Sequence, residues 1–429
     1  MNEPLYLNVY HRYRELILNG SLPPGTKMPS LRTCATELKL SRTTIENAYL
    51  QLAADGYILA RAQSGYYVTD MGQKRKEKES APQKEMPVYR FDFASSGADR
   101  ESFRFDLWRR YMKSALRQDS RLLSYGEPQG EADFRQVLSA YVRERRNILC
   151  SPDSIVVGAG VQSLLQLLCP LLKDRETVSF PTPSFVQGST VFSDFGFQVQ
   201  YRNKDAHVIY VSPAHMTKWG EIMPVKRRLE LIRHAADRGS LIIEDDFENE
   251  FVYLQKPTPS LYSLASGENV VYIGSFSKLL LPSIRLSFMV LPPPLLEAYK
   301  KKAAFYNQTA SKAEQIALCQ FIRDGHLAAQ TRKLKRLYSQ KLKALQKDVK
   351  TVFGENCPLR TGAAGTSLAL TLPYSGSSLK LKEKAERNGL ALSFLNEKEQ
   401  ETTVVLSCSS MPVEDFLPAL KLLYSLCRD

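Results

Sequence analysis

A polar stretch at residues 71–90, MGQKRKEKESAPQKEMPVYR, most constrains how this chain can fold. It contains almost no apolar side chain before Met86. A segment of this composition cannot bury enough apolar surface to fold, so it predicts a flexible linker. We therefore expect a small domain over residues 1–70 and a larger one over 91–429, with a large part to about 299 and a C-terminal lobe from about 300.

The small domain reads as three short helices followed by a β-hairpin. Gly20 and Gly56 are expected to end the first and third helices, and Ser30 and Ser41 to be the N-caps of the second and third. The sequence YILARAQSGYYV then alternates as two strands around a tip at residues 63–65. Two helices joined by a tight turn and followed by a hairpin predict a winged helix-turn-helix.

The segment GSLPPGTKMPSLRTCATELKLSRTTIENAYLQLAADGYILARAQSGYYV resembles the GntR family of bacterial regulators over nearly its whole length. The shared features are PGTKMPSLR, the SRTT start of an expected recognition helix, and LQLAADGYI leading into a wing with SGYYV. Short polar and basic residues at a helix N-terminus can contact phosphates and base edges. The resemblance implies a double-stranded DNA operator as partner.

The residues expected to contact DNA lie at two helix starts and on the wing. They are Arg32, Ser41, Arg42, Thr43 and Thr44, with Asn47 as a candidate base reader and Gly65 letting the wing approach the minor groove. In the alternative interpretation Ser41 is only an N-cap and the two threonines only first-turn residues, which leaves both arginines unexplained. Glu46 departs from relatives that have a basic residue there.

The positive charge of the chain is concentrated outside the small domain. The formal net charge is +13, yet residues 1–70 hold seven basic against six acidic residues. Residues 300–350 hold thirteen basic and three acidic residues. This stretch forms either solvated helix faces or a surface along which operator DNA runs, and charge reversal of Lys333, Lys335 and Arg336 would distinguish the two.

The larger domain alternates apolar runs with helical stretches. The runs SIVVGAG, VIYVSP, SLIIEDD and NVVYIGSFSK predict strands of a largely parallel sheet covered by helices, and LALTL and TVVLSCS predict shorter strands of an α+β lobe. Seven scattered cysteines suggest reduced thiols in the core. No signal peptide or long apolar run is visible, so we expect a cytoplasmic protein.

One loop of the larger domain predicts a cofactor site. The run NVVYIG delivers Ser275, Ser277 and Lys278 onto a loop, and Arg285 follows. A lysine beside hydroxyls and an arginine can form a Schiff base with an aldehyde while its neighbours bind a phosphate. SLIIEDD places Asp245, with Asp246 beside it, where a carboxylate can hold a pyridine nitrogen protonated.

Three further segments complete the expected site. SIVVGAGVQSLL is a strand, a turn and a helix start, so the amides of Val161 and Gln162 can receive a phosphate. Phe185 in PTPSF could stack on a cofactor ring. Tyr125 in SYGEPQG could reach the phosphate of a partner subunit.

These elements, in this order, resemble fold-type I aminotransferases, and with the winged head they resemble the MocR/GabR subfamily of GntR regulators. The resemblance implies an α/β fold of the aspartate aminotransferase type and pyridoxal 5'-phosphate bound through Lys278, Asp245, Phe185, Ser275 and Arg285. It also implies a head-to-tail homodimer.

The sequence departs from the aminotransferase pattern at several positions. Phe247 stands where relatives have a tyrosine that donates to the cofactor's phenolic oxygen, and HMTKWG replaces a stretch with asparagine, although Thr217 could substitute. TVVLSCS lacks the arginine with which amino-acid-binding relatives bind a substrate carboxylate, and Ser367 stands where many relatives have histidine. We therefore expect inefficient transamination.

Our hypothesis is that the effector is the cofactor itself. One alternative is a working aminotransferase with an accessory DNA-binding head, and another is a regulator that responds to an amino acid held by Arg360 or Lys218. In a third alternative the larger domain is only a dimerisation scaffold.

Overall fold

The computed structural model describes residues 4–70, 89–95, 97–99, 101–253, 258–374, 376–395 and 402–428. The chain divides into two compact units, of which the first ends at Pro87 and the second begins at Val88. Of the expected linker at 71–90, all but Tyr89 and Arg90 lies outside the described residues. Within the described ranges no helix combines the length and apolar character needed to cross a membrane.

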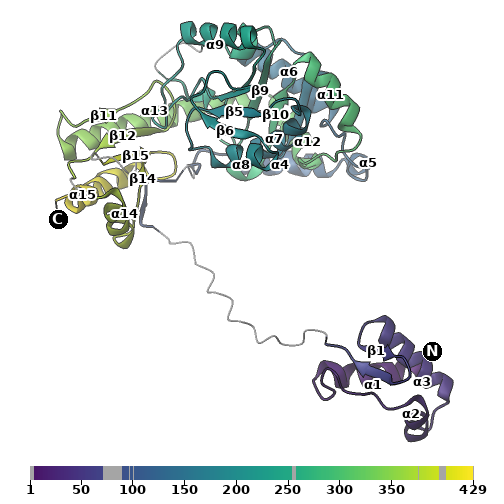
Figure 1. The fold of residues 1–429 in the computed structure, drawn as a ribbon. Coiled ribbons are helices and arrows are strands. Elements are labelled where there is room, and N and C mark those ends of the chain that lie inside the picture. The colour runs from purple at the N-terminus through teal and green to yellow at the C-terminus, as the bar shows by residue number, and fades with distance from the viewer. Residues whose placement is uncertain are drawn as a thin grey trace. The chain divides into compact units, whose positions relative to one another are not determined.

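The first unit is a winged helix-turn-helix, as expected (Figure 1). The Ser30 and Ser41 side chains accept hydrogen bonds from the amides of Thr33 and Thr44, so both serines cap their helices. The two wing strands are antiparallel, with Ile58 opposite Val68. Its elements are α1 (Leu5–Leu18), α2 (Leu31–Leu38), α3 (Arg42–Ala54), β1 (Ile58–Arg61) and β2 (Gly65–Val68).

The second unit is built around a seven-stranded sheet of order β4-β10-β9-β8-β7-β5-β6. β10 runs antiparallel to both its neighbours, and the pairs from β9 to β6 are parallel. The strands are β4 (Ile155–Gly158), β5 (Thr177–Phe180), β6 (Gln198–Tyr201), β7 (Val208–Val211), β8 (Leu241–Asp245), β9 (Val270–Ser275) and β10 (Ser287–Val290). The strands expected in SIVVGAG, VIYVSP, SLIIEDD and NVVYIGSFSK are thus present.

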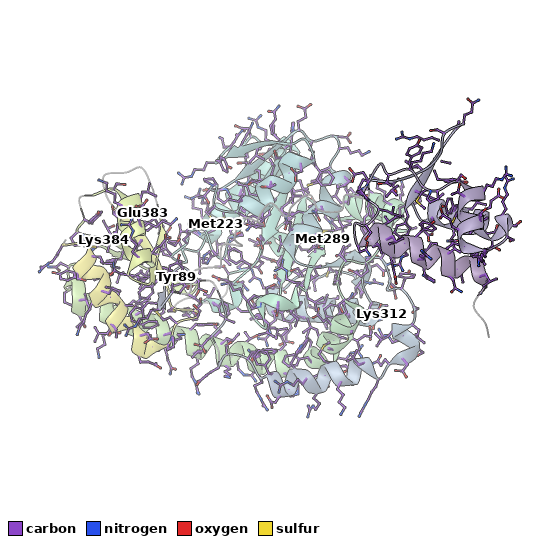
Figure 2. All side chains as sticks on the ribbon, turned by 90° about the horizontal axis from the view of Figure 1, so that it is seen from below. Tyr89, Met223, Met289, Lys312, Glu383 and Lys384 are labelled. Atoms are coloured by element: carbon purple, nitrogen blue, oxygen red, sulfur yellow. The ribbon has the colours of Figure 1, made fainter. Side chains whose placement is uncertain are left out.

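Helices cover both faces of this sheet (Figure 1). Successive residues of a strand point to opposite faces, and Ile242 accordingly packs in one hydrophobic core and Ile243 in another. Met289, labelled in the middle of this unit in Figure 2, is fully buried in the second of these cores. The helices are α4 (Phe105–Leu116), α5 (Asp119–Leu122), α6 (Ala132–Arg146), α7 (Val161–Leu168), α8 (Val186–Asp194), α9 (Val225–Arg238), α10 (Leu261–Leu264), α11 (Pro293–Ala303) and α12 (Lys312–Arg323).

A C-terminal α+β lobe completes the second unit. The long helix α13 (His326–Phe353) contributes to both the first sheet core and the core of the lobe. The lobe's sheet has the order β11-β12-β15-β14, and β3 pairs with β13. The remaining elements are β3 (Phe91–Asp92), β11 (Leu359–Arg360), β12 (Ser367–Thr371), α14 (Ser378–Arg387), β13 (Leu390–Ala391), β14 (Ser393–Phe394), β15 (Thr403–Ser407), α15 (Phe416–Leu426) and the 3-10 helices η1 (Pro152–Ser154), η2 (Cys169–Leu171), η3 (Asn249–Phe251), η4 (Pro282–Ile284) and η5 (Val413–Asp415).

Two broader expectations from the sequence are met. The parallel sheet between helices, followed by a smaller α+β lobe, is the expected fold class. All seven cysteines lie within the described residues and their thiols are free.

Candidate functional site

The candidate cofactor site lies where the central strands end. In open α/β sheets, ligands bind beyond the carboxyl ends of the parallel strands. β8 ends at Asp245, and β9 ends at Ser275 just before Ser277 and Lys278. The sheet therefore brings the two most distinctive site residues of the sequence to the ends of neighbouring strands.

Asp245 has one carboxylate oxygen bound and one unbound among the described residues. Oδ2 accepts a hydrogen bond of 2.5 Å from the hydroxyl of Tyr210, whereas Oδ1 is buried and has no hydrogen-bond partner there. Burial raises the pKa of Asp245 to about 6. A buried acceptor without a donor is costly. This oxygen would be satisfied by an N–H group on a ligand, which is what a protonated pyridine nitrogen provides.

The neighbouring Asp246 is engaged elsewhere. Its carboxylate oxygens lie 2.6 Å and 3.0 Å from Nε and Nη2 of Arg146, and the Tyr272 hydroxyl donates to it at 2.7 Å. Both members of this ion pair are almost fully buried. Asp246 therefore stabilises the packing of α6 against the sheet. Of the two carboxylates, Asp245 is the one with an oxygen that can still accept a hydrogen bond from a ligand.

Lys278 is held by a carboxylate that sequence reasoning missed. Its Nζ lies 3.1 Å from Oε1 of Glu248, and Oε2 of Glu248 lies 3.2 Å from Nδ1 of His215. Burial acts to raise the pKa of Glu248, but the electrostatic effects of Lys278 and then of His215, with the hydrogen bond from Lys278, outweigh it and hold that pKa below its usual value. The only signal in the sequence was the acidic run EDDFENE.

A glycine and an arginine form a cradle at the N-terminus of α7. Gly160, the N-cap residue, has φ 94°, and a Cβ at this position would lie 2.3 Å from Nη2 of Arg285. The amides of Val161 and Gln162 follow in the first helical turn, where backbone N–H groups have no partner within the helix. A guanidinium beside a helix N-terminus is suited to a phosphate. Ser275 Oγ accepts from the amide of Ser277 at 3.4 Å, at the far end of β9.

Phe185 lies at the start of α8, close to the partner of Asp245. Its ring centroid is 5.4 Å from that of Tyr210, with an angle of 34° between the rings. The ring is partly exposed. It can therefore form one wall of a flat ligand site.

Tyr125 and Thr217 have different surroundings. The Tyr125 side chain is 96% exposed, so only another molecule could engage it fully. The hydroxyl of Thr217 accepts from the amide of Glu221 at 3.1 Å, and its carbonyl accepts from Gly220. The threonine hydroxyl is therefore used in its own turn.

The structure also describes the residues at which the sequence departs from the aminotransferase pattern and the two cations considered for a carboxylate. The Phe247 ring lies 5.0 Å from that of His215. The Arg360 guanidinium lies over the Trp219 ring at 5.8 Å, and Lys218 is exposed. Ser367 lies opposite Ser407 in the sheet of the lobe.

A small cavity lies beside Lys278. Its described lining includes the hydroxyl-bearing residues Ser277, Tyr338, Thr366 and Ser409 and contains no arginine.

In the first unit most of the residues expected to contact DNA are exposed. α3 buries Ile45, Ala48, Tyr49 and Leu52. At the starts of α2 and α3 the exposed residues are Arg32, Ser41, Arg42, Thr43, Glu46 and Asn47, and Thr44 is half-buried. Ser41 Oγ also lies 2.7 Å from the Thr44 hydroxyl, so both polar groups take part in the cap.

Two cations that sequence reasoning did not single out lie against the wing, Arg61 from β1 and Lys27 from the segment before α2. Arg61 and Lys27 lie over the ring of Tyr67, at 4.5 Å and 5.8 Å from its centroid. Gly65, at the start of β2, is exposed and has φ 102°. The wing therefore presents positive charge next to the backbone that was expected to approach DNA.

Two protein families match this chain. Residues 5–68 match the bacterial regulatory proteins of the gntR family, and residues 96–360 match the aminotransferases of class I and II. The second match covers more than half of the chain.

Relatives align along most of their length. An uncharacterised HTH-type transcriptional regulator of Bacillus subtilis, YdeL, is 32% identical over 409 residues, which are 91% of this chain and 88% of YdeL. The probable rhizopine catabolism regulatory protein MocR of Rhizobium meliloti is 25% identical, covering 79% of this chain and 76% of MocR. The pyridoxine biosynthesis transcriptional regulator PdxR of Corynebacterium glutamicum is 26% identical, covering 78% and 76%.

Solved structures with the same fold are aminotransferases. An archaeal alanine:glyoxylate aminotransferase superposes with a TM-score of 0.70 at 20% identity, covering 79% of this chain and 90% of the enzyme. The α-aminoadipate aminotransferase LysN of Thermus thermophilus, complexed with N-(5'-phosphopyridoxyl)-L-leucine, has a TM-score of 0.66 at 20% identity, covering 79% and 92%. The chain is therefore a DNA-binding transcription regulator of the MocR/GabR subfamily of GntR regulators, in which a winged helix-turn-helix precedes an aminotransferase-like domain.

Proposed function

We propose that the second unit binds pyridoxal 5'-phosphate and that its occupancy sets how tightly the first unit binds its operator. The observation that carries this proposal is Oδ1 of Asp245, which is buried beside the bound Oδ2 and has no hydrogen-bond partner among the described residues. A protonated pyridine nitrogen would supply the missing donor. When bound, the group supplies an aldehyde for a lysine amine and an aromatic ring that can draw electrons.

The other residues have complementary roles in this proposal. Lys278 attaches the aldehyde, and Phe185 lies against the ring. The phosphate binds between Arg285 and the amides of Val161 and Gln162, because the lack of a side chain at Gly160 lets the guanidinium lie close to this helix N-terminus. Ser275 and Ser277 add hydroxyls at the end of β9.

We further propose that the cofactor is the effector, rather than an amino acid that reacts with it. β15 and the two residues after it, TVVLSCS, contain no arginine that could bind a substrate carboxylate, and Phe247 has no hydroxyl to donate. A hydrogen bond to a charged group contributes about 1.5–3 kcal/mol, so the absence of a guanidinium for the carboxylate weakens amino-acid binding substantially. The name of the relative PdxR links such a regulator to pyridoxine biosynthesis.

The exposed surface at the starts of α2 and α3 is the proposed DNA-reading surface. Arg32, Arg42 and Thr43 would bind phosphates, and Asn47, which follows one turn later, would read a base. Ser41 and Thr44 fix the N-terminus of α3, because each takes part in its cap. Gly65 and the cations around Tyr67 would place the wing on the neighbouring groove.

We propose a head-to-tail homodimer in which a second copy covers the loop around Tyr125. Leu123 and Tyr125 are 90% and 96% exposed. The loop is nevertheless fixed, because Nζ of Lys312, labelled in Figure 2, donates to the carbonyls of Arg121, Ser124 and Tyr125. A well-held loop with exposed apolar tips is suited to a permanent interface.

Operator binding of the full chain, measured with and without pyridoxal 5'-phosphate, tests the proposed function. We expect visible absorbance from the bound cofactor, and a change in operator affinity that Lys278→Ala abolishes. Lys226→Ala, which removes an exposed lysine of α9, should behave as the wild type. Equal operator affinity at full cofactor occupancy would contradict the sensor role. A spectrum and an affinity that respond only to amino acids would favour an amino-acid effector.

A further inference from the structure

Glu248 connects two groups that face the candidate site. One carboxylate oxygen lies 3.1 Å from the Lys278 amine and the other 3.2 Å from the His215 ring. The Glu248 side chain is 5% exposed, whereas that of Lys278 is 29% exposed and lines the cavity. The carboxylate is therefore shielded from solvent and remains close to the lysine.

The backbone around Glu248 is arranged to hold this position. Glu248 has φ 61°, a left-handed conformation that a non-glycine residue rarely adopts, and its carbonyl accepts from the amide of Phe251 at 2.9 Å. Gly365 packs against the pair, because a Cβ there would lie 3.0 Å from Cε1 of His215 and 3.5 Å from Oε2 of Glu248. A strained backbone that the surrounding structure maintains is typical of functional positions.

Attachment of an aldehyde to Lys278 requires a change of charge at Nζ. The ammonium must first lose a proton, and the neutral amine then forms a C=N bond to the aldehyde carbon while the aldehyde oxygen leaves as water. A carboxylate within 3.1 Å favours the charged form and can also accept the proton. We propose that Glu248 holds Lys278 as an ammonium in the cofactor-free regulator and accepts its proton when the aldehyde of pyridoxal phosphate enters. This inference rests on the proposed binding of that cofactor.

Other titratable groups around Glu248 remain uncharged near neutral pH or are paired elsewhere. Burial raises the pKa of Tyr253, and it raises the pKa of both Tyr338 and Cys408 to about 12. Lys341, which lies near Cys408, is bound to Asp99 at 2.6 Å. Among the described residues, His215 is the titratable group besides Lys278 in contact with Glu248, and a positive charge on it would make the carboxylate a weaker proton acceptor.

The test is the rate at which the cofactor-free full chain attaches pyridoxal phosphate, followed by visible absorbance across the pH range. Without the carboxylate, the ammonium form of Lys278 is less favoured. We therefore expect Glu248→Gln to lower the pH of half-maximal attachment by about one unit, equivalent to about a tenfold change in the fraction of free amine. Glu248→Asp, which keeps the charge on a shorter side chain, should show a smaller shift in the same direction.

Glu250→Gln is the matched control. Glu250 is a carboxylate of the same segment, but it accepts from the Tyr141 hydroxyl at 2.6 Å, so its variant should keep the wild-type profile. If the wild type attaches the cofactor and the Glu248 variants have the same pH profile, the proposed role of Glu248 is wrong, whereas the proposed binding of pyridoxal phosphate is supported. If the wild type attaches no cofactor at any pH, both this role and the proposed function are wrong. Should Glu248→Gln fail to fold, the profile of Glu248→Asp decides.

Discussion

The guanidinium of Arg285 lies so close to Gly160 that a β-carbon on the glycine would be 2.3 Å from Nη2. Both residues have positive φ angles, 46° for Arg285 and 94° for Gly160. The short distance brings a permanent positive charge to the N-terminus of α7, where backbone amides already favour anions. The phosphate end of the proposed site depends on this close approach.

Gly160→Ala should therefore weaken binding of pyridoxal phosphate at least about tenfold, or about 1.4 kcal/mol. The methyl group would displace the guanidinium and strain the backbone. Gly196→Ala is the control, because Gly196 also has a positive φ, 85°, but has open space around it. Titrations followed by visible absorbance would measure both affinities. An equal loss in the two variants would mean that backbone strain alone, and not the position of Arg285, determines binding.

Asp245 makes the stability of the cofactor-free protein depend on pH. Burial raises its pKa from 3.8 to about 6, so the folded state binds the proton more tightly than the unfolded state. This contribution to stability is complete below about pH 4 and is lost as the pH rises through about 6. A shift of about two units corresponds to about 3 kcal/mol.

Asp245→Asn lacks this titration, so the cofactor-free variant should gain stability relative to the wild type between about pH 4 and about pH 7. Urea unfolding of both proteins at several pH values would measure the difference in free energy of unfolding. A difference that stays constant with pH would contradict the raised pKa. The same variant should bind the cofactor more weakly, because the amide carries no charge to pair with a pyridinium.

Phe247→Tyr tests whether the missing phenol limits cofactor binding. A hydroxyl at this ring should donate to the cofactor's phenolic oxygen and tighten binding about fivefold, since a net hydrogen bond contributes about 1 kcal/mol. It should also move the visible absorbance maximum. Phe247→Leu keeps the position apolar without a donor and should not tighten binding. If both variants bind as the wild type does, the phenol is not what distinguishes this site.

Sequence reasoning succeeded where a local pattern encodes the structure. The capping serines, the wing and the strands that end at Asp245 and Ser275 all follow from short-range periodicity and helix signals. The contact between Lys278 and Glu248 joins residues thirty positions apart, and that between Arg285 and Gly160 joins more distant ones. Such contacts depend on how strands align in the sheet, which no single segment specifies.

The basic stretch at residues 300–350 illustrates the same limit. In the sequence its basic residues cannot be told apart, but in the structure they differ. Lys341 is buried and paired with Asp99, and Lys333 donates to the carbonyl of Glu101 at 2.6 Å. Apart from Lys333, the exposed cations of α13 recur at spacings of three, four and seven residues, which place them along one side of a helix. They are Arg332, Arg336, Lys343, Lys347 and Lys350.

This exposed row gives the sharpest test of whether operator DNA also binds the second unit. Reversing the charges of Arg332, Arg336 and Lys343 should make the negative slope of log affinity against log salt less steep, by about 0.9 for each DNA phosphate that these cations neutralise in the wild type. The control reverses three exposed cations of α14 and α15, namely Lys380, Arg387 and Lys421. Both triple variants have the same net charge, so a general effect of charge would change the two slopes equally. If the slope becomes less steep only for the α13 variant, operator DNA binds along this helix. If neither slope changes, or both change equally, these cations form only a solvated helix face.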